Sequence, residues 1–196
     1  MLSKEELLVP LARLRGDAVV VTCMGVTRPW GRHSNHDLDF ASADSAMGHT
    51  ADLALGIALA RPERRVVCLN GDGSMLMTLG TLVTAAQTGA RNYVLFVVQN
   101  GTYEITGNQA VPGSGCIDFA ALARGAGFTS VYSFDDALTY ESKLPEMLSA
   151  EGPIFAVVKV SPGSEGPISR SEREASRYLK ISLADWGRSL KRALEE

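Results

Sequence analysis

The chain has 196 residues, of which 45% are hydrophobic and 21% are charged, and its formal net charge at pH 7 is −3. These values are typical of one soluble globular domain and give no reason to expect binding to nucleic acid or to an anionic membrane. No apolar run reaches the roughly 18 residues that a transmembrane helix requires. We therefore expect a cytoplasmic protein in which the scattered cysteines Cys23, Cys68 and Cys116 are reduced, buried thiols and form no iron–sulfur site.

Apolar runs and helix-like segments alternate through the first half of the chain. A charged, helix-like segment over 1–17 comes first and is unlike a signal peptide. The valine-rich runs at 18–25 and 65–71 are almost uniformly apolar, and they predict strands that are buried on both faces. Between them a helix is expected over 45–62, where small and apolar residues recur at helical spacing up to Pro62.

The second half continues the same pattern. A helix over 74–90 leads to an apolar strand over 93–100. The remaining elements are helices at 118–127 and 135–148, strands at 130–134 and 154–160 and, after a polar loop, a helix near 183–195. This alternation predicts a three-layer α/β sandwich around a mostly parallel central sheet. We assign residues 1–161 to this domain and expect 162–196, a C-terminal loop and helix, to belong to it as well.

Glycine-rich polar segments follow two of the predicted strands at the points where the strands end. Gly71-Asp72-Gly73-Ser74 follows one strand, and Gln99-Asn100-Gly101 ends the next. In such sheets, ligands bind beyond the carboxyl ends of the strands. Glycines at the start of a helix suit a phosphate group, but Asp72 would repel phosphate unless a cation lay between them.

A divalent cation would resolve that conflict. Mg2+ prefers oxygen ligands and bridges a carboxylate to a phosphate. The Asp72 carboxylate, the side-chain oxygen of Asn100 and a backbone carbonyl in the turn Gly101-Thr102 could supply three of them. Either segment alone is ordinarily just a turn. The two together, at adjacent strand ends, predict a clamp for a metal and a diphosphate.

Residues 69–109 resemble the diphosphate-binding motif of thiamine diphosphate enzymes, which begins with Gly-Asp-Gly and ends with Asn-Asn. This chain has Gln99-Asn100, so it departs from the pattern in the first residue of the pair and keeps the second, the metal ligand in that family. More narrowly, "SAMGHTADLALGIALARPERRVVCLNGDGSMLMTLGTL" and "NGTYEITGNQ" are similar to the phosphonopyruvate and sulfopyruvate decarboxylase group. The resemblance covers about residues 15–160 and implies the thiamine diphosphate-binding fold.

The resemblance also implies a role for each matching residue. The side chains of Asp72 and Asn100 and the carbonyl of Thr102 would bind Mg2+. Met47 would be the bulky apolar residue under the cofactor, although plain core packing is the simpler interpretation of a methionine; Ser45 and Met47 would also contact the pyrimidine ring through backbone groups. The complete cofactor-binding set is Gly25, Ser45, Met47, Gly71, Asp72, Gly73, Ser74, Asn100, Thr102 and Tyr103.

The residue that activates the cofactor is not evident in this chain. In the family a glutamate from a separate pyrimidine-binding domain does so, and no second α/β unit is found here. Glu104 follows the metal turn and is not expected to take this role. We therefore expect the catalytic glutamate on a partner α subunit, in an α2β2 assembly. This chain would be the β subunit of a thiamine diphosphate-dependent decarboxylase of an anionic three-carbon 2-oxo acid, such as sulfopyruvate or phosphonopyruvate.

Three alternatives remain open: a carboligase, the β subunit of a 2-oxo acid oxidoreductase, and a non-catalytic regulatory subunit. The missing cysteine cluster argues against the oxidoreductase, because electrons would have no nearby exit. The presence of Asp72 and Asn100 argues against the non-catalytic regulatory subunit, in which the cofactor fold would be kept without turnover. His33 and His36 lie in a polar loop without a third ligand. Arg28, Arg32 and Arg170 are candidates for an anionic substrate group, with surface solvation as the simpler interpretation.

Overall fold

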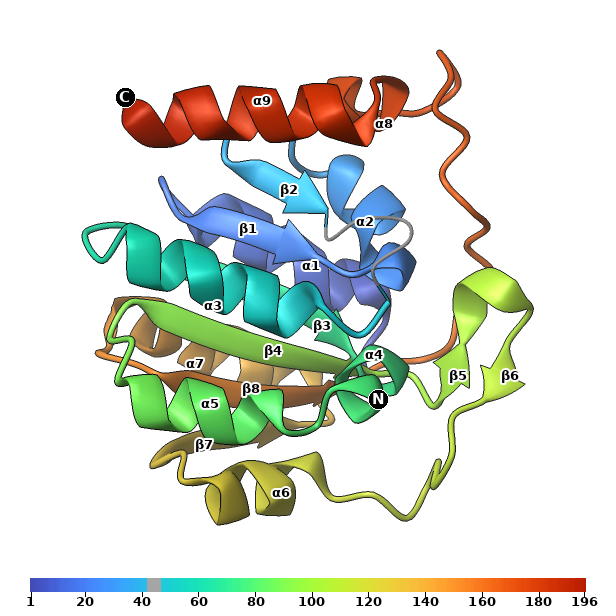
Figure 1. Ribbon diagram of the computed structural model, residues 1–196. Helices are drawn as coiled ribbons and strands as arrows, with labels where there is room; N and C mark the ends of the chain where they lie inside the picture. The colour runs from blue at the N-terminus through green and yellow to red at the C-terminus, as the bar shows by residue number, and fades with distance from the viewer. Residues whose placement is uncertain (42–46) are drawn as a thin grey trace.

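A computed structural model describes residues 1–41 and 47–196 of the chain. Its centre is a six-stranded sheet in the order β2-β1-β3-β4-β8-β7, with every neighbouring pair parallel (Figure 1). The strands are β1 (Val19–Thr22), β2 (Asp39–Ala41), β3 (Val66–Gly71), β4 (Tyr93–Gln99), β7 (Ser130–Phe134) and β8 (Ile154–Lys159). The predicted α/β fold with a parallel central sheet is confirmed.

Helices cover both faces of this sheet and complete the three layers (Figure 1). One face carries α3 (Thr50–Ala60), α4 (Asp72–Met77), α5 (Thr81–Thr88) and α6 (Phe119–Ala126), and the other carries α1 (Lys4–Leu14), α2 (Met24–Gly31) and α7 (Ala137–Ser149). Along β4, Leu95 and Val97 pack into the first core, while Val94 and Phe96 pack into the second. Strands that are buried on both faces need apolar residues at every position, which explains the uniform runs in the sequence.

Two predictions about the helices need correction. The helix expected over 74–90 is two helices, because Thr78 leaves the helical region and its hydroxyl donates a hydrogen bond to the carbonyl of Gly48. Helix α2, which carries Gly25 and Pro29, and the three-residue strand β2 were not predicted from the sequence. In β2, buried Asp39 is acceptable because Arg15 forms a buried ion pair with its carboxylate and Trp30 donates to it at 2.9 Å.

The chain ends in the short helix α8 (Arg177–Lys180) and in α9 (Leu183–Glu195), which lies along the β2 edge of the sheet (Figure 1). Trp186 fixes α9 there, since its ring nitrogen donates to the backbone oxygen of Asp39 at 2.6 Å. Residues 161–174, which lie between β8 and α8, form a segment that we call the C-terminal strap. None of the helices in the described ranges combines the length and the apolar character needed to cross a bilayer.

The three cysteines are free thiols. Cys23 and Cys68 are buried, as expected, and burial raises the pKa of the Cys23 thiol to about 11. Cys116 is exposed, which corrects the expectation of burial for this residue. The reason is local, because Cys116 lies in the loop that precedes α6 and not in an apolar run.

Candidate functional site

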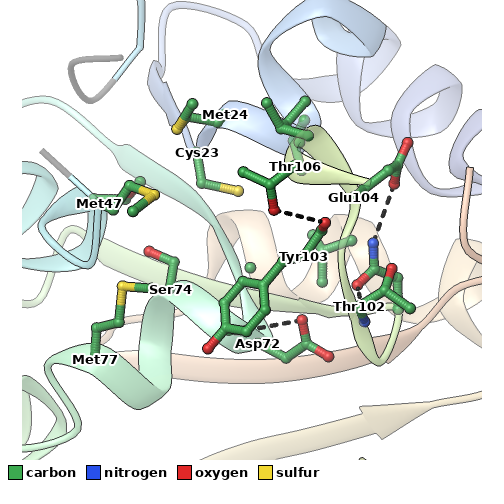
Figure 2. Close-up of a pocket in the computed structure, with 18 of the residues that line it drawn as sticks. Cys23, Met24, Met47, Asp72, Ser74, Met77, Thr102, Tyr103, Glu104 and Thr106 are labelled. Carbon is green, nitrogen blue, oxygen red and sulfur yellow. Dashed lines mark hydrogen bonds between the residues drawn. The ribbon is translucent and has the colours of Figure 1, made fainter. Parts of the chain in front are cut away.

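A cavity of about 310 Å³ opens at the carboxyl ends of β1, β3 and β4. It brings together the segments that follow these strands, and Figure 2 shows Met47 and Ser74 on one side of it and Thr102 and Glu104 on the other. All the predicted cofactor residues that the structure describes line it: Gly25, Met47, Gly71, Asp72, Gly73, Ser74, Asn100, Thr102 and Tyr103. Ser45 lies outside the described residues. The two glycine-rich segments, distant in sequence, therefore face one space.

The first wall of the cavity is the Asp72 turn, residues 71–74. Its carboxylate is buried and accepts two backbone hydrogen bonds, from Gly73 at 2.9 Å and from Gly101 at 2.7 Å. Burial raises the pKa of Asp72 above its ordinary value, although these hydrogen bonds oppose the shift. A buried carboxylate held by neutral donors is costly, and a bound cation would relieve that cost. The electrostatics of the turn therefore suit a metal ion.

Gly73 and Ser74 give this turn two further features, and the second of them suits a phosphate group. A side chain at Gly73 would place its Cβ 2.3 Å from a ring carbon of Tyr103, so only glycine fits between the turn and that ring. The hydroxyl of Ser74 is buried and has no hydrogen-bond partner among the described residues. Buried hydroxyls in folded proteins nearly always have a partner, and so this one can serve a ligand. The helix that follows the turn is shorter than expected, since α4 ends at Met77.

The second wall is the Asn100 turn, residues 99–104, which leads into the small hairpin of β5 (Thr102–Tyr103) and β6 (Gln109–Ala110). The side-chain oxygen of Asn100 accepts from the backbone N–H of Thr102 at 3.0 Å, and its amide nitrogen donates to Glu104 at 3.1 Å. The oxygen keeps a second lone pair, which is what a metal ligand requires.

Two charged residues behind this turn were not predicted as a pair. Lys4 donates to both carboxylate oxygens of Glu104, at 2.8 and 2.6 Å, and also to the backbone oxygen of Gly25 at 2.9 Å. Burial alone would raise the pKa of Glu104, but Lys4 and a backbone N–H of Glu165 lower it further than burial raises it. One signal in the sequence marks Lys4, since a lysine in the first turn of a helix opposes the helix dipole.

Met47 is not a core residue. Its side chain is 54% exposed and lies on the rim of the cavity with Met77, which is 46% exposed. Core packing, the simpler interpretation of this methionine, is therefore wrong. An exposed methionine beside a largely apolar opening is available to contact a ligand.

The other candidates of the sequence analysis lie away from the cavity. His33 contacts Glu5, and His36 accepts from the backbone of its own loop. Arg28 and Arg32 pair with carboxylates of the C-terminal strap, at 2.8 Å to Glu174 and 2.6 Å to Glu165. Within ranges 1–41 and 47–196, no three His, Cys, Asp or Glu side chains cluster as metal ligands. A metal here would depend on the mixed set of Asp72, Asn100 and Thr102.

A family model matches most of this chain, and known proteins resemble it in sequence. The model for "thiamine pyrophosphate enzyme, C-terminal TPP binding domain" matches residues 20–158. The β subunit of sulfopyruvate decarboxylase from Methanothermobacter thermautotrophicus is 43% identical over 119 residues, which cover 61% of this chain and 60% of that one. Phosphonopyruvate decarboxylase from Streptomyces hygroscopicus is 34% identical over 184 residues, 90% of this chain and 44% of that one. The chain thus spans about half the length of these relatives.

Solved structures show the same fold. The thiamine diphosphate-dependent 4-hydroxybenzoylformate decarboxylase of Rhodococcus jostii RHA1 matches with a TM-score of 0.62 and 24% identity, over 83% of this chain and 33% of that one. At this identity the likeness supports the fold alone. The sequence matches confirm the resemblance that the Gly-Asp-Gly and Asn-Gly segments indicated.

Proposed function

Because the chain belongs to the thiamine pyrophosphate enzyme family through its C-terminal TPP binding domain, we propose that it binds thiamine diphosphate and Mg2+ in the cavity at the ends of β1, β3 and β4. One observation carries this proposal. The buried Asp72 carboxylate and the Ser74 hydroxyl, which has no partner among the described residues, line the same cavity, so this cavity offers places for both a cation and an anion. A magnesium diphosphate group has this combination of charges.

The residues of the cavity would divide the work of holding the cofactor. The side chains of Asp72 and Asn100 and the carbonyl of Thr102 would hold Mg2+. The diphosphate would lie against Gly25, Gly71, Gly73 and Ser74, beside Tyr103, and the thiamine rings would lie over Met47, with Ser45 expected near the pyrimidine. When bound, the cofactor supplies a nucleophilic carbon and an electron sink for 2-oxo acids.

We propose that the reaction is the decarboxylation of a 2-oxo acid with an anionic end. The names of the two relatives, sulfopyruvate decarboxylase subunit beta and phosphonopyruvate decarboxylase, support this substrate class. The first name also supports a partner α subunit. We propose that this partner supplies the activating glutamate and that the assembly is α2β2. Free thiols at all three cysteines fit the reducing cytoplasm.

Thermal unfolding tests the cofactor proposal directly. Thiamine diphosphate and Mg2+ together should raise the unfolding midpoint, since a ligand at 100 times its Kd stabilises the native state by about 2.7 kcal/mol. Asp72→Ala should abolish the shift, because the carboxylate ligand is lost. Glu146→Gln, at an exposed salt bridge on α7, is the matched control and should keep it. No shift in the wild type, even with the partner subunit present, would overturn the proposal.

A reconstitution assay tests the reaction and the partner. The purified chain should show no decarboxylation alone and should gain activity when the α subunit is added. A panel containing sulfopyruvate, phosphonopyruvate and pyruvate should show a preference for the acids with an anionic end. Robust turnover by the single chain would contradict the shared active site, and carboligation without decarboxylation would contradict the reaction.

A further inference from the structure

We propose that Lys4 and Glu104 are positioning residues for Asn100: together they fix which end of its amide faces the cavity and so set the affinity of the site for Mg2+. The observation behind this inference is a buried ion pair in contact with a proposed metal ligand. The side chain of Glu104 is 1% exposed and that of Lys4 is 11% exposed. The inference rests on the proposed function, because it assigns these residues a task in that same site.

The chemistry of an amide explains why its orientation needs to be fixed. One end of the Asn100 side chain donates hydrogen bonds and the other accepts them, and only the oxygen can bind a metal. The two ends have nearly the same shape, so packing alone distinguishes them poorly. An ionised carboxylate only accepts, and therefore the Glu104 contact at 3.1 Å forces the amide nitrogen toward Glu104. The oxygen must then point the other way, where it meets the N–H of Thr102.

Lys4 stabilises the buried, ionised form of Glu104. A buried carboxylate without a cation costs several kcal/mol, whereas a pair in close contact offsets much of that cost. The three described acceptors of the Lys4 ammonium are the two oxygens of Glu104 and the carbonyl of Gly25, which matches the three protons that it can donate. The described contacts of Lys4 thus go to Glu104 and to the first turn of α2, and they leave it no proton for an anionic ligand.

The C-terminal strap fixes Glu104 from the other side. The backbone N–H of Glu165 donates to one of its oxygens at 2.8 Å, and the amide of Asn108 donates to the carbonyl of Gly163 at 3.0 Å. Glu104 therefore accepts from the first helix, the Asn100 turn and the strap together. A carboxylate held from three directions has one orientation, and it passes that orientation to Asn100.

The molecule offers a matched control for this idea. Arg28 and Glu174 form a second close ion pair, at 2.8 Å, and the Glu174 side chain is 4% exposed. Glu174 contacts Arg28 and Ser169, and it has no described contact with the Asn100 turn. Replacing either glutamate removes a buried charge from an ion pair, but only Glu104 touches a proposed metal ligand.

The experiment compares Glu104→Gln with Glu174→Gln. Mg2+ is titrated into the chain, with its partner subunit where cofactor binding requires it, at saturating thiamine diphosphate, and the Mg2+ Kd is read from the unfolding midpoint and by calorimetry. Both variants should lower the midpoint of the metal-free protein. Glu104→Gln should weaken Mg2+ binding about tenfold or more, since a glutamine can turn its own N–H toward Asn100. Glu174→Gln should leave the Kd within about twofold of wild type.

Lys4→Met is the second variant and keeps the test decisive if Glu104→Gln folds poorly. It removes the cation and leaves the Glu104 carboxylate chemically intact, and it should also weaken Mg2+ binding about tenfold. A wild type that shows no magnesium-dependent stabilisation overturns the proposed function, and this inference with it. A wild type that binds Mg2+, with Glu104→Gln and Lys4→Met binding it equally well, overturns the inference alone.

Discussion

The two turns that face the cavity are held in place in different ways. Asp72 is fixed by the backbone, because both of its described hydrogen bonds come from main-chain N–H groups of Gly73 and Gly101. Asn100 is fixed largely by side-chain charges, through Glu104 to Lys4, which lies about 100 residues earlier in the chain. A carboxylate held by main-chain N–H groups keeps its donors when side chains are substituted, whereas an amide held by a remote ion pair depends on those particular side chains.

Asn100→Asp should disturb the second turn most. It places a new carboxylate 3.1 Å from that of Glu104, and Lys4 cannot neutralise both. We expect the free energy of unfolding of the metal-free protein to fall by about 4 kcal/mol, the cost of an uncompensated buried charge. Denaturant unfolding measures it, with Asn100→Ala as the control at a loss of about 1 kcal/mol. If the two variants lose the same stability, the charge-held description of this turn is wrong.

Acid should weaken the ion pair that Glu174 of the C-terminal strap forms with Arg28. The hydrogen bonds and charge of Arg28 outweigh burial and lower the pKa of Glu174 to about 2. Because the folded pKa lies below the ordinary value, the carboxylate stabilises the fold above about pH 4.5, and this is lost as the pH falls toward 2. At neutral pH, the free energy of unfolding of the wild type should exceed that of Glu174→Gln by about 3 kcal/mol.

Unfolding of both proteins across pH 2 to 7 measures that difference. The gap in stability between wild type and Glu174→Gln should close as the pH falls. A gap that stays constant with pH would show that Glu174 supports the strap by shape alone.

Gly73→Ala tests the contact between the two turns and should have the smallest effect. The added Cβ would lie 2.3 Å from the ring of Tyr103, so the ring or the turn must move. Overpacking of this kind costs about 2 kcal/mol. Tyr103→Ala in the same protein should restore the stability, which a double-mutant cycle by denaturant unfolding would measure. A cycle without coupling would mean that the turns are independent at this point.

Most of the fold could be predicted from the sequence because its strands are buried on both faces. Uniform apolar runs such as 93–100 are a direct consequence of that burial. Strand β2 could not be found this way, since Asp39-Phe40-Ala41 is short and begins with a charge that only its tertiary partners make acceptable. The helix break at Thr78 likewise depends on a hydrogen bond to Gly48, 30 residues away.

The candidate site could likewise be predicted from the sequence only in part. The two turns carry local motifs, and the structure brings the residues of both to one cavity. Lys4 has no motif, and nothing in the sequence around it names Glu104 as its partner. Only the packing of α1 beside the strand ends brings these charges together. The ligand-binding turns could therefore be predicted from local motifs, whereas the Lys4–Glu104 pair that supports one of them could not.

The place of the first residues beside the cavity bears on how the protein is labelled. Leu2 forms an isolated parallel bridge with Val160, and Lys4, two residues later, reaches the cavity wall. A bulky label on exposed Met1, three residues before Lys4, would lie near the wall of the cavity and complicate binding assays. A label on Glu196, which is exposed at the end of α9, would leave that wall clear. The same proximity makes the first residue a useful attachment point for a fluorophore that reports on ligand binding.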